Sequence, residues 1–213
     1  MSTDLLPEQI TFADEGLKQV TVWSRGVLQN KEARDVAVAL AMAAGSDGKF
    51  ADAWENYVDL PDRVNVPVRS YARISSEPIE MKYVYVNNEP DIVVLLEETL
   101  VKGLPITEGL KPGGTLVVNT RRDPAYIAKF VRDKRNLAKV VCVDASGLGQ
   151  AQVTLSGAEG ATDATGIAGG WAGVLVGAVA RATGLVSLEA LKAAAKRPEL
   201  VVSGYDSAVI MEL

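Results

Sequence analysis

The sequence predicts an α/β protein: a single domain with a mixed, mostly parallel sheet and helices on both faces. Two apolar, β-branched runs, residues 92–96 (IVVLL) and 115–118 (TLVV), are each typical of a strand that is buried on both faces. Between them lie a short polar helix and the turn Lys111-Pro112-Gly113-Gly114. This strand, helix and strand order indicates the α/β class.

The first third of the chain adds one strand, one helix and one antiparallel strand. Residues 19–23 (QVTVW) alternate in polarity and predict the first strand, which the turn Ser24-Arg25-Gly26 follows. Residues 32–45 predict a helix that ends on Gly45 as its C-terminal cap. Residues 49–57 are an aromatic-rich stretch, and the alternating run 68–74 (VRSYARI) predicts an antiparallel strand.

The last third is predicted to be mainly helical, after one more buried strand at residues 138–143. Helices are expected at residues 124–130, 171–183 and 187–196, with a final turn near Tyr205. Ser187 occupies the capping position of its helix and Glu189 the first turn, which complements the helix dipole. The glycines at 166, 169, 170, 173 and 177 predict a loop that leads into a buried helix, which another backbone approaches closely.

Length and periodicity predict one α/β domain over residues 19–213, preceded by an N-terminal extension of residues 1–18. The net charge of −5 gives no basis for nucleic-acid binding. Arg121-Arg122 is expected to be a solvated face or a protein contact. The longest uncharged run, residues 164–180, is shorter than a membrane span, so no membrane segment is expected.

Histidine is absent and Cys142 is the one cysteine, which together exclude several kinds of chemistry within this chain. Ser-His-Asp and Cys-His catalysis and histidine-based metal sites need histidine. One thiol cannot ligate an iron–sulfur cluster or close an internal disulfide. Cys142 is therefore predicted to be a core residue of a strand, and a free thiol without a disulfide framework favours a reducing, cytoplasmic setting.

Polar side chains follow the predicted strands at their carboxyl ends, where open α/β sheets hold their ligands. These candidate residues are Glu97, Glu98, Asn119, Thr120, Asp144 and Ser146. The alternative interpretation is helix capping and turn formation by the same side chains. Aromatic residues that could anchor an interface, or simply belong to the core, are Trp54, Tyr57, Tyr83 and Tyr85.

Three segments in this order resemble a known family: residues 83–101 (YVYVNNEPDIVVLLEETLV), 109–120 (GLKPGGTLVVNT) and 173–194 (GVLVGAVARATGLVSLEALKAA). Together they are similar to the gamma subunit of 2-oxoacid:acceptor oxidoreductases of the pyruvate:ferredoxin type. The similarity spans residues 20–205, which is nearly the whole chain.

The resemblance implies a non-catalytic subunit of a complex that oxidatively decarboxylates a 2-oxoacid to an acyl-coenzyme A. Thiamine diphosphate, Mg²⁺ and [4Fe-4S] clusters are expected in partner chains, because this chain cannot ligate a cluster and lacks a thiamine motif. The implied partners are thiamine-binding alpha and beta subunits, a ferredoxin-like delta subunit, and ferredoxin or a flavin subunit as electron acceptor. The chain itself would close the active-site cleft and help to bind coenzyme A.

One segment departs from the family pattern. Members usually carry Gly-Arg-Gly-Gly-Gln-Gly after the first strand, whereas residues 24–30 here read SRGVLQN. Loss of the glycines weakens a phosphate cradle, but Arg25 and Gly26 are retained. The cofactor-binding residues expected for coenzyme A are therefore Ser24, Arg25, Gly26, Asn119 and Thr120, and the alternative is a turn that only packs on its neighbours or contacts a partner subunit.

Two other functions stay open. The first is a stand-alone nucleotide- or coenzyme A-binding α/β protein, against which the missing glycine fingerprint argues. The second is a structural assembly subunit that binds no small molecule.

Overall fold

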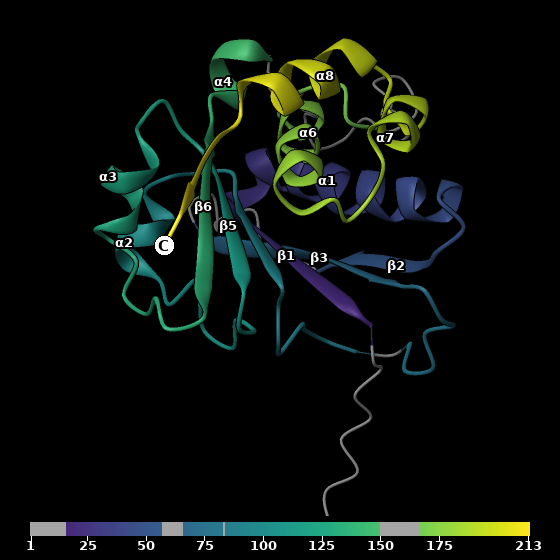
Figure 1. Ribbon diagram of the computed structural model, residues 1–213, viewed down its shortest axis with the longest axis horizontal. Helices are drawn as coiled ribbons and strands as arrows, with labels where there is room; N and C mark the ends of the chain where they lie inside the picture. Colours follow the sequence, from purple (N-terminus) through teal and green to yellow (C-terminus); the bar gives the residue numbers. More distant parts are fainter. Residues whose placement is uncertain (1–15, 57–65, 83, 150–166) are drawn as a thin grey trace, which may run out of the picture.

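The computed structural model describes residues 16–56, 66–82, 84–149 and 167–213. Within these residues, seven strands form one sheet in the order β2-β3-β1-β4-β5-β6-β7 (Figure 1). Its centre consists of four parallel strands: β1 (Lys18–Arg25), β4 (Ile92–Leu95), β5 (Gly114–Asn119) and β6 (Leu137–Val143). The predicted mixed sheet with a parallel centre is confirmed.

The edges of the sheet are antiparallel. On one side β3 (Pro67–Ser75) pairs with β1, and β2 (Phe50–Glu55) pairs with β3. On the other side β7 (Val209–Glu212) pairs with β6. The sequence predicted β3 but not β2 or β7, because short edge strands with half-exposed side chains lack a clear apolar pattern.

Helices cover both faces of the sheet, as predicted. One face packs against α1 (Gly26–Ser46) and α6 (Trp171–Thr183), and α7 (Leu188–Ala194) and α8 (Pro198–Ser207) pack on these two helices (Figure 1). The short helices α2 (Leu100–Gly103) and α3 (Pro124–Ala128) cover the other face of the central strands, and α4 (Ala145–Leu148) follows β6. The α8 helix occupies the segment in which the sequence indicated only a turn.

Alternation along the central strands divides the apolar residues between two cores. In β4, Val94 packs with the α1 and α6 side, whereas Val93 and Leu95 pack with α2 and α3. Every residue of β4 and β5 is buried, which confirms the expectation of strands buried on both faces. Cys142 lies in the second core with 3% of its surface exposed, as predicted for a core cysteine.

The α1 helix begins six residues earlier than its apolar pattern indicates. Gly26 adopts a φ of +65°, a conformation that glycine tolerates best, and its N–H donates to the Val66 carbonyl at 2.7 Å. The Arg25 N–H donates to the side chain of Gln29 at 3.0 Å, which stabilises the first turn. At the other end the helix passes Gly45 and ends at Ser46 with Asp47 as its C-cap, so the predicted cap at Gly45 is two residues early.

The glycines of α6 allow the close helix contact that their spacing predicted. A Cβ at Gly177 would overlap the carbonyl oxygen of Val201, and one at Gly204 would overlap that of Val174. The α6 and α8 backbones therefore touch directly. Gly166 lies outside the described residues.

Candidate binding crevice at the carboxyl ends of the strands

Strands β4, β5 and β6 end at the same edge of the sheet, and their following residues surround a crevice of about 530 Å³. It is lined by Leu96, Glu97, Glu98, Asn119, Thr120, Arg121, Arg122, Asp144, Ser146 and Trp171. All six polar residues that the sequence places at strand ends are among them. Parallel strands end on one side of a sheet, so residues far apart in sequence meet there.

Asn119 connects the three strand ends. Its Nδ2 donates to the Leu96 carbonyl at 3.1 Å and to Ser146 Oγ at 3.0 Å, and its Oδ1 accepts from the Ser146 N–H at 3.2 Å. The side chain is 6% exposed. Because its amide is engaged in these bonds, Asn119 shapes the floor of the crevice.

Thr120 and Glu98 form a second hydrogen-bonded group among the residues that line the crevice. The Thr120 hydroxyl donates to Glu98 Oε2 and accepts from the Arg122 N–H, the latter at 3.0 Å. Arg122 Nε also donates to Glu98 Oε1 at 3.2 Å, and its guanidinium lies 4.5 Å from the centre of the Tyr126 ring. The Glu98 carboxylate thus has a cation beside it and is held in one orientation.

Asp144 forms an acidic group of the opposite wall. It caps α4 by accepting from the Gly147 N–H at 2.8 Å, and it accepts from Arg121 Nε at 2.9 Å. Arg121 is about three-quarters exposed and Arg122 about half exposed. Both guanidinium groups therefore remain accessible at the rim while each is paired with a carboxylate.

Arg25 links the end of β1 to this crevice. Its Nη2 donates to Thr99 Oγ1 at 3.4 Å, and the same hydroxyl donates to Glu97 Oε1 at 3.1 Å. Ser24, one residue earlier, is fully buried on the α1 side of the sheet. Of the five predicted cofactor-binding residues, Asn119 and Thr120 therefore line the crevice and Arg25 adjoins it. Gly26 begins α1, and Ser24 is buried away from the crevice.

The part of the chain that the structure describes contains no group of three histidine, cysteine, aspartate or glutamate side chains placed to hold a metal ion. Burial raises the pKa of the Cys142 thiol to about 12, and the charges of Asp123 and Glu98 add to this effect. Among the described residues, the crevice therefore presents two guanidinium groups and three carboxylates, and no thiolate nucleophile.

Comparison with known proteins places this arrangement in a family. The model of the pyruvate ferredoxin/flavodoxin oxidoreductase family matches residues 36–198. The chain belongs to this family. The gamma subunit common to the pyruvate and ketoisovalerate oxidoreductases of Thermococcus kodakarensis is 34% identical over 158 residues, which are 74% of this chain and 75% of that protein.

Solved structures of the family share the fold. A pyruvate oxidoreductase subunit called PORC, from Thermotoga maritima, superposes with a TM-score of 0.65 at 26% identity over 92% of this chain and 99% of its own. The gamma subunit of a keto/oxoacid ferredoxin oxidoreductase from Geobacter sulfurreducens gives a TM-score of 0.58 over 90% and 94% of the two chains. At 20% identity this second likeness shows the fold alone. The resemblance to gamma subunits inferred from the sequence is confirmed.

The strand-end candidates lacked four residues of the crevice: Leu96, Arg121, Arg122 and Trp171. The sequence predicts a solvated face or a protein contact for Arg121 and Arg122, although they directly follow Asn119 and Thr120 at the same strand end. Trp171 begins α6 and reaches the crevice only through the fold, so no local pattern reveals it.

Of the four aromatic residues expected at an interface or in the core, the structure describes Trp54 and Tyr85. Tyr85 is 80% exposed, and Trp54 stacks on Tyr71 with ring centres 5.2 Å apart while its Nε1 donates to the Tyr85 carbonyl at 3.3 Å. Tyr57 and Tyr83 lie outside the described residues.

None of the helices in the described segments is long and apolar enough to cross a membrane.

Proposed function

We propose that this chain is the gamma subunit of a thiamine-diphosphate and iron–sulfur dependent complex that oxidatively decarboxylates a 2-oxoacid to an acyl-coenzyme A. Its role is non-catalytic: it closes the active-site cleft and helps to bind coenzyme A. The observation that carries this proposal is the crevice at the strand ends, whose described carboxylates are held by neighbouring groups of the same chain. Such a surface suits binding and positioning more than proton transfer or nucleophilic attack.

Partner chains would supply the reactive groups. The proposal assigns thiamine diphosphate and Mg²⁺ to alpha and beta subunits and [4Fe-4S] clusters to a ferredoxin-like delta subunit. Ferredoxin or a flavin subunit would accept the electrons. A chain with one buried cysteine and no histidine has no ligand set for these clusters, which supports this division of labour.

Arg25 is the residue proposed to meet the anionic end of coenzyme A. Arg25 is itself the N-cap residue of α1, a 21-residue helix, and its side chain makes no capping hydrogen bond. The positive end of the helix dipole therefore lies next to Arg25. Gly26 allows the tight turn there through its positive φ. Asn119 and Thr120 would contribute by fixing the neighbouring wall.

Affinity purification of the tagged full-length chain from its native host tests the assembly. We expect partner chains carrying iron and thiamine to co-purify with it in fixed stoichiometry. A chain that purifies alone, folded and without those partners would overturn the subunit assignment.

The Arg25→Gln variant of the assembled complex tests the coenzyme A contact. Loss of a charged hydrogen-bond donor is expected to raise the KM for coenzyme A about tenfold or more. The decarboxylation step measured without coenzyme A should not change, and Arg135→Gln, which alters an exposed arginine paired with Asp133, should behave as the wild type. An unchanged KM would favour the purely structural subunit.

A further inference from the structure

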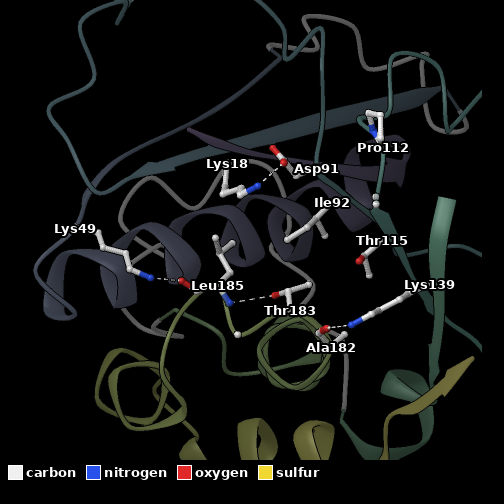
Figure 2. Close-up of a pocket in the computed structure, with 13 residues that line it drawn as sticks. Lys18, Lys49, Asp91, Ile92, Pro112, Thr115, Lys139, Ala182, Thr183 and Leu185 are labelled. Carbon is white, nitrogen blue, oxygen red and sulfur yellow. Dashed lines mark hydrogen bonds and ion pairs between the residues drawn. The ribbon is translucent and has the colours of Figure 1, made fainter. Parts of the chain in front are cut away.

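A second cavity lies at the opposite end of the parallel strands from the crevice, beside the amino ends of β1, β4 and β5 (Figure 2). Its volume is about 420 Å³, within the range of small-molecule sites. The lining residues are Lys18, Lys49, Asp91, Ile92, residues 112–115, Lys139 and residues 182–185. Three lysines from three separate parts of the chain thus surround it.

Within the described part of the chain, each of these ammonium groups makes one hydrogen bond. Lys49 Nζ donates to the Leu185 carbonyl at 2.6 Å, and Lys139 Nζ donates to the Ala182 carbonyl at 3.2 Å (Figure 2). Lys18 Nζ donates to Asp91 Oδ1 at 2.9 Å. An ammonium group has three donors, so each of these contacts leaves capacity for a ligand.

The charge balance around this cavity is positive. Asp91 is the carboxylate among its lining residues, and it also lies 3.8 Å from the ammonium of Lys111. Outside the lining, hydrogen bonds from Ser187 lower the pKa of the nearby Asp47 carboxyl, and the charge of Lys49 adds to this effect. Glu212 lies opposite Lys139 on β7, and no ion pair within 4 Å joins them in the described structure. The carbonyls at the end of α6 attract the lysines but carry only partial charge. A local excess of cations in a chain of net charge −5 calls for an anionic partner.

We propose that this lysine cavity binds a small molecule that carries adjacent phosphate groups. Its cations are lysines, which act as point charges toward phosphate and lack the planar fork with which arginine grips a carboxylate. The cavity is separated from the strand-end crevice by the length of the sheet. The proposal therefore does not rest on the proposed function.

Calorimetric titration of the full-length chain with inorganic pyrophosphate tests the site. We expect saturable binding of one pyrophosphate per chain, weakened about tenfold or more in Lys18→Gln and in Lys139→Gln. Lys192→Gln, which alters a lysine on α7 paired with Glu189, should bind as the wild type does. The Lys18 ammonium bonds to Asp91 and not to the backbone at the end of α6, so the Lys18→Gln variant is expected to remain folded. Circular dichroism would verify this.

Three results would overturn the proposal: no saturable binding, equal weakening in the Lys192 variant, or tighter binding of citrate than of pyrophosphate. The last result would assign the cavity to carboxylates. Titration of Arg25→Gln separates the two sites, because pyrophosphate binding in the lysine cavity should be retained when the coenzyme A contact is removed.

Discussion

Asn119 and Ser146 bind each other in both directions: the Asn119 amide donates to Ser146 Oγ at 3.0 Å and accepts from the Ser146 N–H at 3.2 Å. The same amide donates to the Leu96 carbonyl, so one side chain joins the ends of β4 and β5 to the short helix α4 that follows β6. The crevice depends on this connection, since its walls belong to three segments that are far apart in sequence.

Replacing Asn119 with alanine should destabilise the chain by about 2 kcal/mol, because the carbonyl of the buried Leu96 and the N–H and hydroxyl of Ser146 lose their hydrogen bonds. Urea unfolding measures this change. Asn88→Ala, at an exposed asparagine, should alter stability by less than about 0.5 kcal/mol. Equal effects of the two substitutions would show that the connection at the strand ends is not needed for stability.

Gly177→Ala should cost about 3 kcal/mol or prevent folding, because the new methyl group would overlap the Val201 carbonyl and lie 2.8 Å from the Tyr205 nitrogen. Gly45→Ala is its matched control: it is also helical, and a Cβ there has no atom within 4 Å. That change should stabilise α1 by about 0.5–1 kcal/mol. Thermal unfolding of both variants checks the opposite signs.

Asp47 should stabilise the chain in a pH-dependent manner. Its carboxylate accepts from the Ser187 hydroxyl and N–H, both at 2.6 Å, and these hydrogen bonds lower its pKa below the ordinary 3.8. A lowered folded-state pKa gives stability that is present above pH 3.8 and is lost as the pH falls through the folded value. Asp47→Asn should therefore lower Tm by a few degrees at pH 7.

The same Asp47→Asn variant and the wild type should converge in Tm as the pH falls below 3.8. Asp206→Asn, at an exposed position of α8, is the control, and it should differ little from the wild type at pH 7. A difference between Asp47→Asn and the wild type that stays constant down to pH 2 would contradict a role for the carboxylate charge.

Cys142 should be unreactive in the folded chain. With its pKa at about 12, the thiol is protonated at pH 8, and 3% of the residue is exposed. An aromatic disulfide reagent is expected to label it slowly in the native protein and rapidly in guanidinium chloride. Rapid stoichiometric labelling of the native chain would contradict the buried placement.

The sequence alone was sufficient for the class of fold, because buried parallel strands leave continuous apolar runs. Residues 92–96 and 115–118 are such runs, and both became central strands. Edge strands leave a weaker pattern: β2 carries Ala51, Asp52 and Ala53 at half-buried positions and gains its order from pairing with β3. The local pattern also places the start of α1 too late in the sequence, because the helix begins at Gly26, whose N–H bonds to the carbonyl of the distant Val66.

The positions of the strand-end residues were predictable for the same reason, since parallel strands bring their carboxyl ends together. Glu97, Asn119 and Asp144 do lie around one crevice. Which groups remain accessible there was decided by tertiary contacts: Asn119 is engaged by Leu96 and Ser146, while Arg121 and Arg122 extend to the rim. The lysine cavity has no sequence signal at all, because Lys18, Lys49 and Lys139 meet only when β1, the end of α1 and β6 are assembled around the end of α6. Periodicity and strand-end chemistry are local properties, so the sequence by itself determined the parallel centre of the sheet and its polar edge. The short edge strands and the pairing of charges across distant segments were decided by the packing of the folded chain.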